Sequence, residues 1–155
     1  MSYFHEEQTF RSPWVWGILA FAFLPLSVAA LLGHFNSDLL EGVTVVLFIT
    51  ALFLLARLVV DVDATQIRIS FHFLWPTRRI PISDVRTARA KEYNSLLDYG
   101  GWGVRLSRAG WAFNTGGAQG VLVETKRGKR IMIGSHRAKE LEAAIARAVA
   151  ERPGA

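Results

Sequence analysis

The chain has 155 residues and a formal net charge of +5, with 51% hydrophobic and 20% charged residues. It has no cysteine, which excludes disulfides, thiolate nucleophiles, iron–sulfur clusters and zinc sites built on thiolates. Most of the hydrophobic excess lies within residues 14–62, and most of the positive charge follows it. This division indicates an apolar segment joined to a small basic domain.

Two apolar runs follow a short N-terminal segment, residues 1–13, which we expect to be cytoplasmic. Residues 14–35 contain no Asp, Glu, Lys or Arg. A helix of this length rises about 33 Å, enough to cross a hydrocarbon core of roughly 30 Å. The second run, residues 42–62, carries Arg57 towards its end, where a long side chain can snorkel to the headgroups. The sequence therefore predicts a transmembrane hairpin over residues 14–62.

The charges on either side of the two runs predict the orientation of this hairpin. The connection, residues 36–41, is acidic and has no Lys or Arg, whereas Arg11, Arg57 and the basic domain flank the runs. The positive-inside rule then predicts that both termini lie in the cytoplasm, at the inner (cytoplasmic) membrane of the cell. A cleaved signal peptide ending near residues 27–29 is the alternative, but the first run is longer than a usual signal-peptide core.

The remaining residues, 63–155, read as a β domain closed by one helix. Residues 65–74 alternate strictly between apolar and polar, as a half-buried strand does. Further strands are predicted, separated by turns, at 78–92 (after a turn at 75–77, with a bulge or edge near Pro81), 102–106, 111–114, 120–125 and 130–134. Apolar residues then recur at helical spacing over 136–151, with Ser135 as the expected N-cap. The predicted fold class is α+β, a bent antiparallel sheet or open barrel with a capping helix.

Four segments resemble the bacterial pleckstrin-homology-like (PH-like) domain. They are IPISDVRTARA (80–90), YGGWGVR (99–105), GVLVETKRGKRIMIGSHR (120–137) and the closing helix ELEAAIARAV (140–149). Members of this family with two preceding transmembrane helices are common. The resemblance implies a PH-like fold and a cytoplasmic domain, but it implies no catalytic or ligand-binding residue.

The sequence offers no arrangement that predicts catalysis. Its glycine clusters precede strands rather than helices, so they predict turns and not phosphate loops. No pair of histidines has metal-ligand spacing, and no serine lies in a nucleophile motif. We therefore expect no enzyme activity, no metal and no cofactor.

The basic residues of the domain are the candidate contact site. The six candidate residues fall in two clusters: Arg78 and Arg79, then Lys126, Arg127, Lys129 and Arg130. If the clusters converge, they form a surface for anionic lipid headgroups or an acidic partner; the alternative is a solvated surface that follows the positive-inside rule. The predicted function is a membrane-anchored, non-enzymatic binding or scaffolding module, and no nucleic acid is expected as a partner. The alternative is a small accessory subunit of a larger membrane complex, with the helical hairpin as a contact surface.

Overall fold

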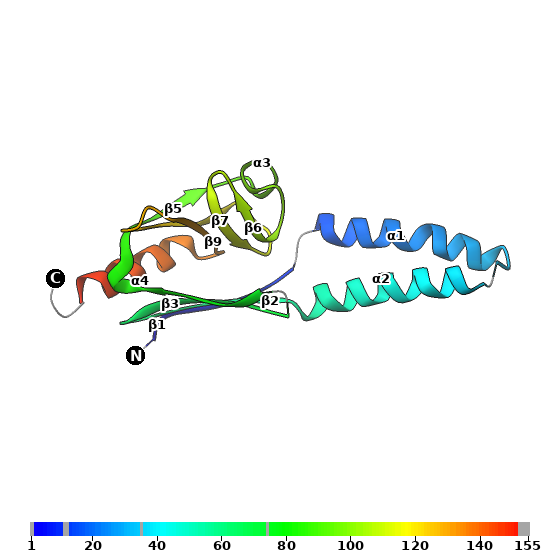
Figure 1. The fold of residues 1–155 in the computed structure, drawn as a ribbon, viewed down its shortest axis with the longest axis horizontal. Coiled ribbons are helices and arrows are strands. Elements are labelled where there is room, and N and C mark those ends of the chain that lie inside the picture. The colour runs from blue at the N-terminus through cyan, green and yellow to red at the C-terminus, as the bar shows by residue number, and fades with distance from the viewer. Residues whose placement is uncertain (1, 11–12, 35, 74, 152–155) are drawn as a thin grey trace.

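The computed structural model describes residues 2–10, 13–34, 36–73 and 75–151, and its fold is α+β. A β domain with two sheets and a C-terminal helix forms one end of the molecule, and a pair of long helices projects from it (Figure 1). Three residues used in the sequence predictions, Arg11, Phe35 and Leu74, lie outside the described residues, as does the side chain of Trp14.

The first sheet has four antiparallel strands in the order β1-β2-β3-β4. Their bounds are β1 Ser2–Thr9, β2 Arg57–Asp63, β3 Gln66–His72 and β4 Trp75–Pro81. Alternate residues of the two central strands are fully buried, among them Val60 on β2 and Ile69 and Phe71 on β3. The alternation predicted for residues 65–74 is confirmed over β3.

Two strands of this sheet correct the sequence prediction. β1 lies in the N-terminal segment, for which no strand was predicted, and β2 lies where the second membrane helix was expected to continue to residue 62. The helix ends at Leu55 because Ala56 is extended and Arg57 begins the strand. Arg57 is therefore not a snorkelling helix residue; it forms an ion pair with Glu7 of β1, with Nη1 and Oε1 2.7 Å apart.

The second sheet has five strands in the order β5-β8-β9-β7-β6, and β7 and β9 run parallel. Their bounds are β5 Val85–Glu92, β6 Gly103–Ser107, β7 Gly110–Asn114, β8 Gln119–Thr125 and β9 Arg130–Gly134. The hairpin predicted across residues 126–129 is confirmed by the pairing of β8 with β9.

The segments around β5 differ from the prediction in three places. The turn predicted at 75–77 belongs to β4, and the predicted long strand 78–92 is broken by a 3₁₀ turn, η1 (Ile82–Asp84), because Ile82 turns into the core. The connection after β5 contains a short helix, α3 (Ser95–Tyr99). The Asn94 side chain caps α3 by accepting from the N–H groups of Leu96 and Leu97, at 3.0 and 3.1 Å.

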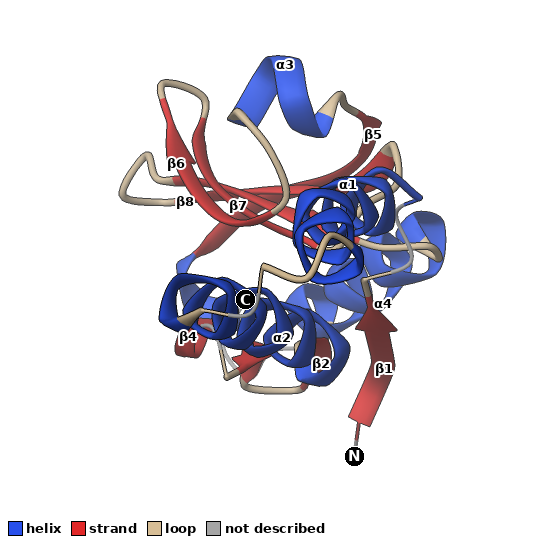
Figure 2. Cartoon of the chain, turned by 90° about the vertical axis from the view of Figure 1, so that its right-hand side faces the viewer, coloured by secondary structure: helices blue, strands red, loops and turns tan. Residues whose placement is uncertain are grey.

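The C-terminal helix, α4 (Ala138–Ala150), packs against strands of both sheets. Looking along the helical hairpin, Figure 2 shows one sheet above the other, with α4 on one side. Leu141, Ile145 and Ala148 form its buried face. The predicted start at 136 with Ser135 as N-cap is wrong, because the helix begins at Ala138 with Arg137 at the N-cap position. The Ser135 hydroxyl accepts from the Arg137 N–H at 3.0 Å and donates to the Glu6 carboxylate of β1.

The projecting helices are α1 (Pro13–Leu31) and α2 (Ser37–Leu55), shorter than the predicted runs. The predicted start of the second run at residue 42 is wrong, because the Asn36 side chain caps the helix and most of the predicted connection 36–41 is helical. Gly42 of α2 permits a close approach, since a Cβ there would lie 2.9 Å from Cδ2 of Leu26. Within the described residues, α2 is the one helix that is long and apolar enough to cross a membrane, and the apolar stretch Val15–Leu31 of α1 is shorter.

The base of the helices is packed into the β domain. The Phe10 ring makes an edge-to-face contact with Phe53 of α2, with ring centroids 5.0 Å apart, and also lies 5.8 Å from Phe71 of β3. Val15 and Leu19 of α1 belong to the same buried cluster. The helices and the sheets therefore share one continuous apolar core at their junction.

Candidate functional site

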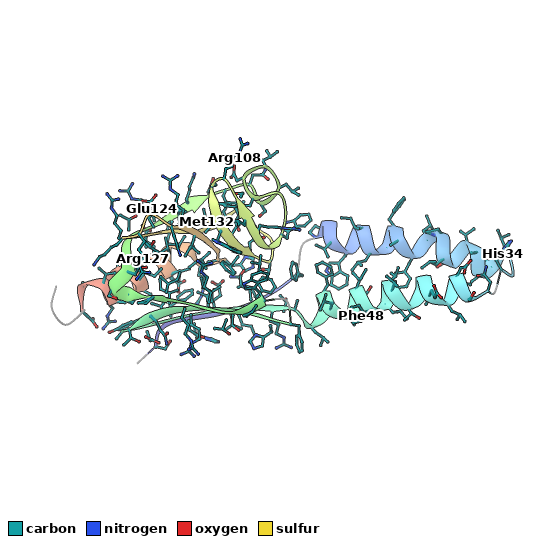
Figure 3. The ribbon with its side chains drawn as sticks, in the orientation of Figure 1. His34, Phe48, Arg108, Glu124, Arg127 and Met132 are labelled. Carbon is teal, nitrogen blue, oxygen red and sulfur yellow. The ribbon has the colours of Figure 1, made fainter. Side chains whose placement is uncertain are left out.

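The surface of the helical hairpin (α1, α2 and their connection) is the first candidate functional feature. Large apolar side chains are exposed along its length, including Phe21 at 76%, Leu31 at 86% and Phe48 at 69%. Figure 3 shows His34 at the tip, well away from the β domain, and Phe48 on the half of α2 that is nearer the domain. An exposed apolar surface of this extent requires an apolar environment, which a partner or a membrane supplies.

A buried polar network fixes β1 and so fixes the start of the helical hairpin. The Gln8 side chain donates to the Gly134 carbonyl at 2.8 Å and accepts from the Thr115 hydroxyl at 3.0 Å. The Glu6 carboxylate accepts from the Ser135 hydroxyl at 2.5 Å and from the His136 N–H at 3.0 Å. Because β1 pairs with β2 in one sheet and bonds to the end of β9 in the other, it ties the two sheets together.

The second candidate feature is a groove of about 350 Å³ where β4 and η1 meet the turn between β8 and β9. We call it the basic groove. Four of the six basic residues singled out from the sequence line it, together with Ser83, Asp84 and Thr125; the four are Arg78, Arg79, Arg127 and Lys129. The folding of the two sheets against each other thus brings the two predicted clusters together.

The cations of the basic groove are held in different ways. The Arg78 guanidinium lies 5.2 Å from the Trp111 ring centroid and 5.9 Å from that of Phe113, so its orientation is fixed by stacking. Burial lowers the pKa of Arg78 from its usual value, but an arginine still carries its charge at neutral pH. Arg127 Nε lies 3.8 Å from the Asp84 carboxylate, a distant pair between partly exposed groups.

The other two predicted residues do not line the basic groove. Arg130 Nε donates to the Glu124 carboxylate at 3.1 Å on the neighbouring strand. Lys126 is exposed at the turn between β8 and β9. Sequence reasoning missed the groove's oxygen-bearing residues Ser83, Asp84 and Thr125, although each lies within a few positions of a predicted cation.

The basic groove lies at the end of the β domain farthest from the helical hairpin. Thr9, Arg57 and His72 mark the hairpin end of the first sheet, whereas Pro81, which lines the groove, pairs with Gln66 at the opposite end. Figure 3 shows Arg127 at the end of the domain remote from the helices. A surface in this position points away from whatever surrounds the hairpin.

The chemistry available in the basic groove is anion binding. Its four cations face one carboxylate, so an anionic group gains charge-assisted hydrogen bonds there. Within the described residues, no group of three His, Asp or Glu side chains lies close enough to hold a metal ion. Comparison of the sequence with models of known protein families and with curated proteins finds no match.

Proposed function

We propose that this chain is a membrane-anchored, non-enzymatic binding module. The helical hairpin lies in the bilayer, the β domain lies at its cytoplasmic surface, and the basic groove binds an acidic partner. The observation that carries the proposal is the exposed apolar surface of both helices, which project from a domain with an ordinary buried core. The hydrocarbon of a bilayer covers such an apolar surface. The helical backbone can enter it because its N–H and C=O groups are already hydrogen-bonded within the helix.

The pairing of β1 with β2 supports two crossings rather than one. Thr9 and Arg57 lie side by side in the sheet, so the chain leaves and re-enters the β domain at the same place. If α2 crosses the bilayer, α1 must cross as well. The tip carries Asp38 and Glu41 and the β domain carries most of the cations, which favours a tip outside and both termini in the cytoplasm.

The position of the basic groove favours an acidic partner over the lipid of the same membrane. A headgroup of the bilayer that holds the hairpin would have to reach the far end of the domain. An anionic patch on a protein in the cytoplasm meets no such obstacle, and charge complementarity speeds its association. We also propose that the β domain is PH-like, and two packed sheets followed by a C-terminal helix support this.

A charge placed in the middle of α2 tests the membrane anchor. Leu47→Arg puts a guanidinium at the centre of the proposed span, which costs about 3 kcal/mol there. We expect the wild-type chain to resist extraction by alkaline carbonate and Leu47→Arg to be depleted from the membrane. Leu47→Ala controls for the position and Ala64→Arg, in the exposed turn between β2 and β3, for the charge. Release of the wild-type chain by carbonate would contradict the proposal.

The absence of cysteine permits a direct test of orientation. Ser37→Cys places one thiol at the hairpin tip, and Ala64→Cys places one on the β domain. We expect a membrane-impermeant maleimide to label Ser37→Cys in intact spheroplasts and to label Ala64→Cys only after lysis. The reverse pattern would place the β domain outside the cell.

A second candidate function, an accessory subunit of a membrane complex, is favoured by one observation. An apolar hollow of about 770 Å³ lies between α1 and α2 near the tip, lined by residues that include Phe21, Leu24 and Val28. A helix of another membrane protein could fill it. Purification in mild detergent distinguishes the two functions, because a subunit would keep one partner in fixed stoichiometry.

A further inference from the structure

Outside the helical hairpin, the large apolar side chains that are exposed in the described residues lie in few places. One pair, Phe73 and Trp75, belongs to the turn between β3 and β4; a second pair, Leu96 and Leu97, belongs to α3; the fifth is Leu106 on β6. We call the first two pairs the hairpin-facing rim, for the reasons that follow.

The turn between β3 and β4 lies level with the base of the helices. α2 ends at Leu55, and Arg57 two residues later pairs with His72, the last residue of β3. Phe73 follows directly. The other pair lies at the same end of the domain, since Figure 1 shows α3 on the side towards the helices. Both pairs therefore flank the point where the helices leave the domain.

The local conformations direct these side chains outward. Phe73 has a φ of 65°, the one positive value among the described non-glycine residues, and its side chain is 73% exposed. This conformation is unfavourable for an aromatic residue and presents the ring to the surroundings instead of the core. On α3, Tyr99 packs edge-to-face on Tyr93 with ring centroids 5.8 Å apart, while Leu97 on the outer side is 84% exposed.

We infer that the hairpin-facing rim rests in the headgroup region of the bilayer that holds the helices. The inference depends on the proposed membrane insertion and adds a second lipid contact to it. Aromatic side chains are favoured at this interface, and a short helix with leucines outward presents the apolar face that interfacial helices bury. The rim also lies at the end of the domain from which the helices project, so insertion of the helices brings it to the membrane surface without a further partner.

The consequence is a fixed orientation of the β domain. The helices give one attachment, and the two pairs of the rim give two more on different sides of it. Attachments beside the helices restrict tilting of the domain. The basic groove at the opposite end is then held away from the bilayer, open to the cytoplasm.

Depth measurements on single-cysteine variants of the full-length chain test this inference. The variants Phe73→Cys and Leu97→Cys probe the rim, Phe48→Cys probes the proposed span, and Arg127→Cys probes the groove. Each carries a nitroxide label in vesicles of phosphatidylcholine and phosphatidylglycerol, and its collisions with oxygen and with a water-soluble nickel chelate are compared. Circular dichroism checks that each variant is folded. If Phe73→Cys is not folded, Trp75→Cys takes its place, and if Leu97→Cys is not folded, Leu96→Cys takes its place.

We expect the labels at 73 and 97 to lose nickel accessibility relative to the label at 127, and the label at 48 to lose it most. Labels at 73 or 97 as accessible as at 127, with 48 in the hydrocarbon, would overturn the inference and leave the proposed anchor intact. A label at 48 that is open to nickel would overturn the proposed anchor itself. Shielding of the rim that disappears when the protein-to-lipid ratio is lowered would assign the rim to a protein contact and overturn the inference.

Discussion

Thr9, the last residue of β1, lies opposite Arg57, the first residue of β2, although the whole helical hairpin separates them in the sequence. The hairpin is therefore an insertion into the first pair of strands of the four-stranded sheet. A signal peptidase cut near residues 27–29 would remove β1, whose Glu6 and Gln8 side chains bond to the other sheet. This role of β1 counts against the signal-peptide alternative.

The pairing predicts that the β domain can be separated from its helices. Replacing residues 11–55 by Asn-Gly leaves a short loop between β1 and β2, of a length common in β-hairpins. We expect this chain to be soluble and folded, with a cooperative thermal transition. Residues 63–155 alone, which lack β1 and β2, should show no such transition. A cooperative transition for 63–155 would show that the first two strands are dispensable.

Glu6 and Glu7 are neighbours in β1, but we expect their side chains to contribute differently to the stability of the fold. Glu6 is buried and accepts two hydrogen bonds, whereas Glu7 is exposed and pairs with Arg57. Glu6→Ala leaves the Ser135 hydroxyl and the His136 N–H without their acceptor, which should cost about 2–3 kcal/mol. Glu7→Ala should cost at most about 1 kcal/mol, as for an exposed ion pair.

Urea unfolding of the full-length chain in detergent measures both variants. Equal losses for Glu6→Ala and Glu7→Ala would contradict the role given to the buried network. The comparison is well matched, because the two variants remove the same side chain from adjacent positions of one strand.

The basic groove predicts that binding depends on position and not on total charge. The triple variant Arg79→Ala, Arg127→Ala and Lys129→Ala removes three of its cations. The control triple Arg89→Ala, Lys91→Ala and Lys139→Ala removes three exposed cations elsewhere. We expect retention on immobilised polyglutamate to fall for the first variant and to persist for the second, at the ionic strength of the cytoplasm. Equal losses would show a diffuse positive surface without a site.

The lowered pKa of Asp63, at the turn between β2 and β3, predicts that the stability of the fold depends on pH. Burial opposes its ionisation, but hydrogen bonds from the Thr65 hydroxyl, the Thr65 N–H and the Gln66 N–H outweigh this and lower the pKa of Asp63. A lowered folded-state pKa gives stability that is present above the unfolded value of about 3.9 and lost as the pH falls through the folded value.

Asp63→Asn removes this titration and keeps an acceptor oxygen. We therefore expect the wild-type chain to be more stable than Asp63→Asn at pH 7, and the difference to shrink below about pH 4. Thermal unfolding in detergent at pH 7 and pH 3 measures it. A difference that is constant with pH would assign the effect to geometry and not to charge.

The elements that local pattern predicts are the ones with an apolar face of their own. β3 alternates strictly, β8 and β9 flank a turn with Gly128, and α4 repeats apolar residues at helical spacing. Each signal is contained within one segment of sequence, so tertiary context is not needed to read it.

The elements that local pattern misses depend on distant partners. β1 turns Glu6 and Gln8 inward, so it lacks apolar alternation, and its partner strand lies beyond both helices. At the boundary between α2 and β2 the only polar residue is Arg57, and apolar residues lie on both sides of it. A single arginine near the end of an apolar run is compatible with a longer membrane helix, so the boundary at Ala56 is hidden. The basic groove joins β4 to the turn between β8 and β9, and their proximity follows only from the packing of the two sheets.

The position of the helices between β1 and β2 also sets the order in which the chain can mature. β1 leaves the ribosome before either helix, and its partner strand leaves after both. Until both helices and β2 have been synthesised, β1 has an unpaired edge and the first sheet cannot form. In the full-length chain, assembly of the first sheet therefore waits until both helices and β2 have been synthesised.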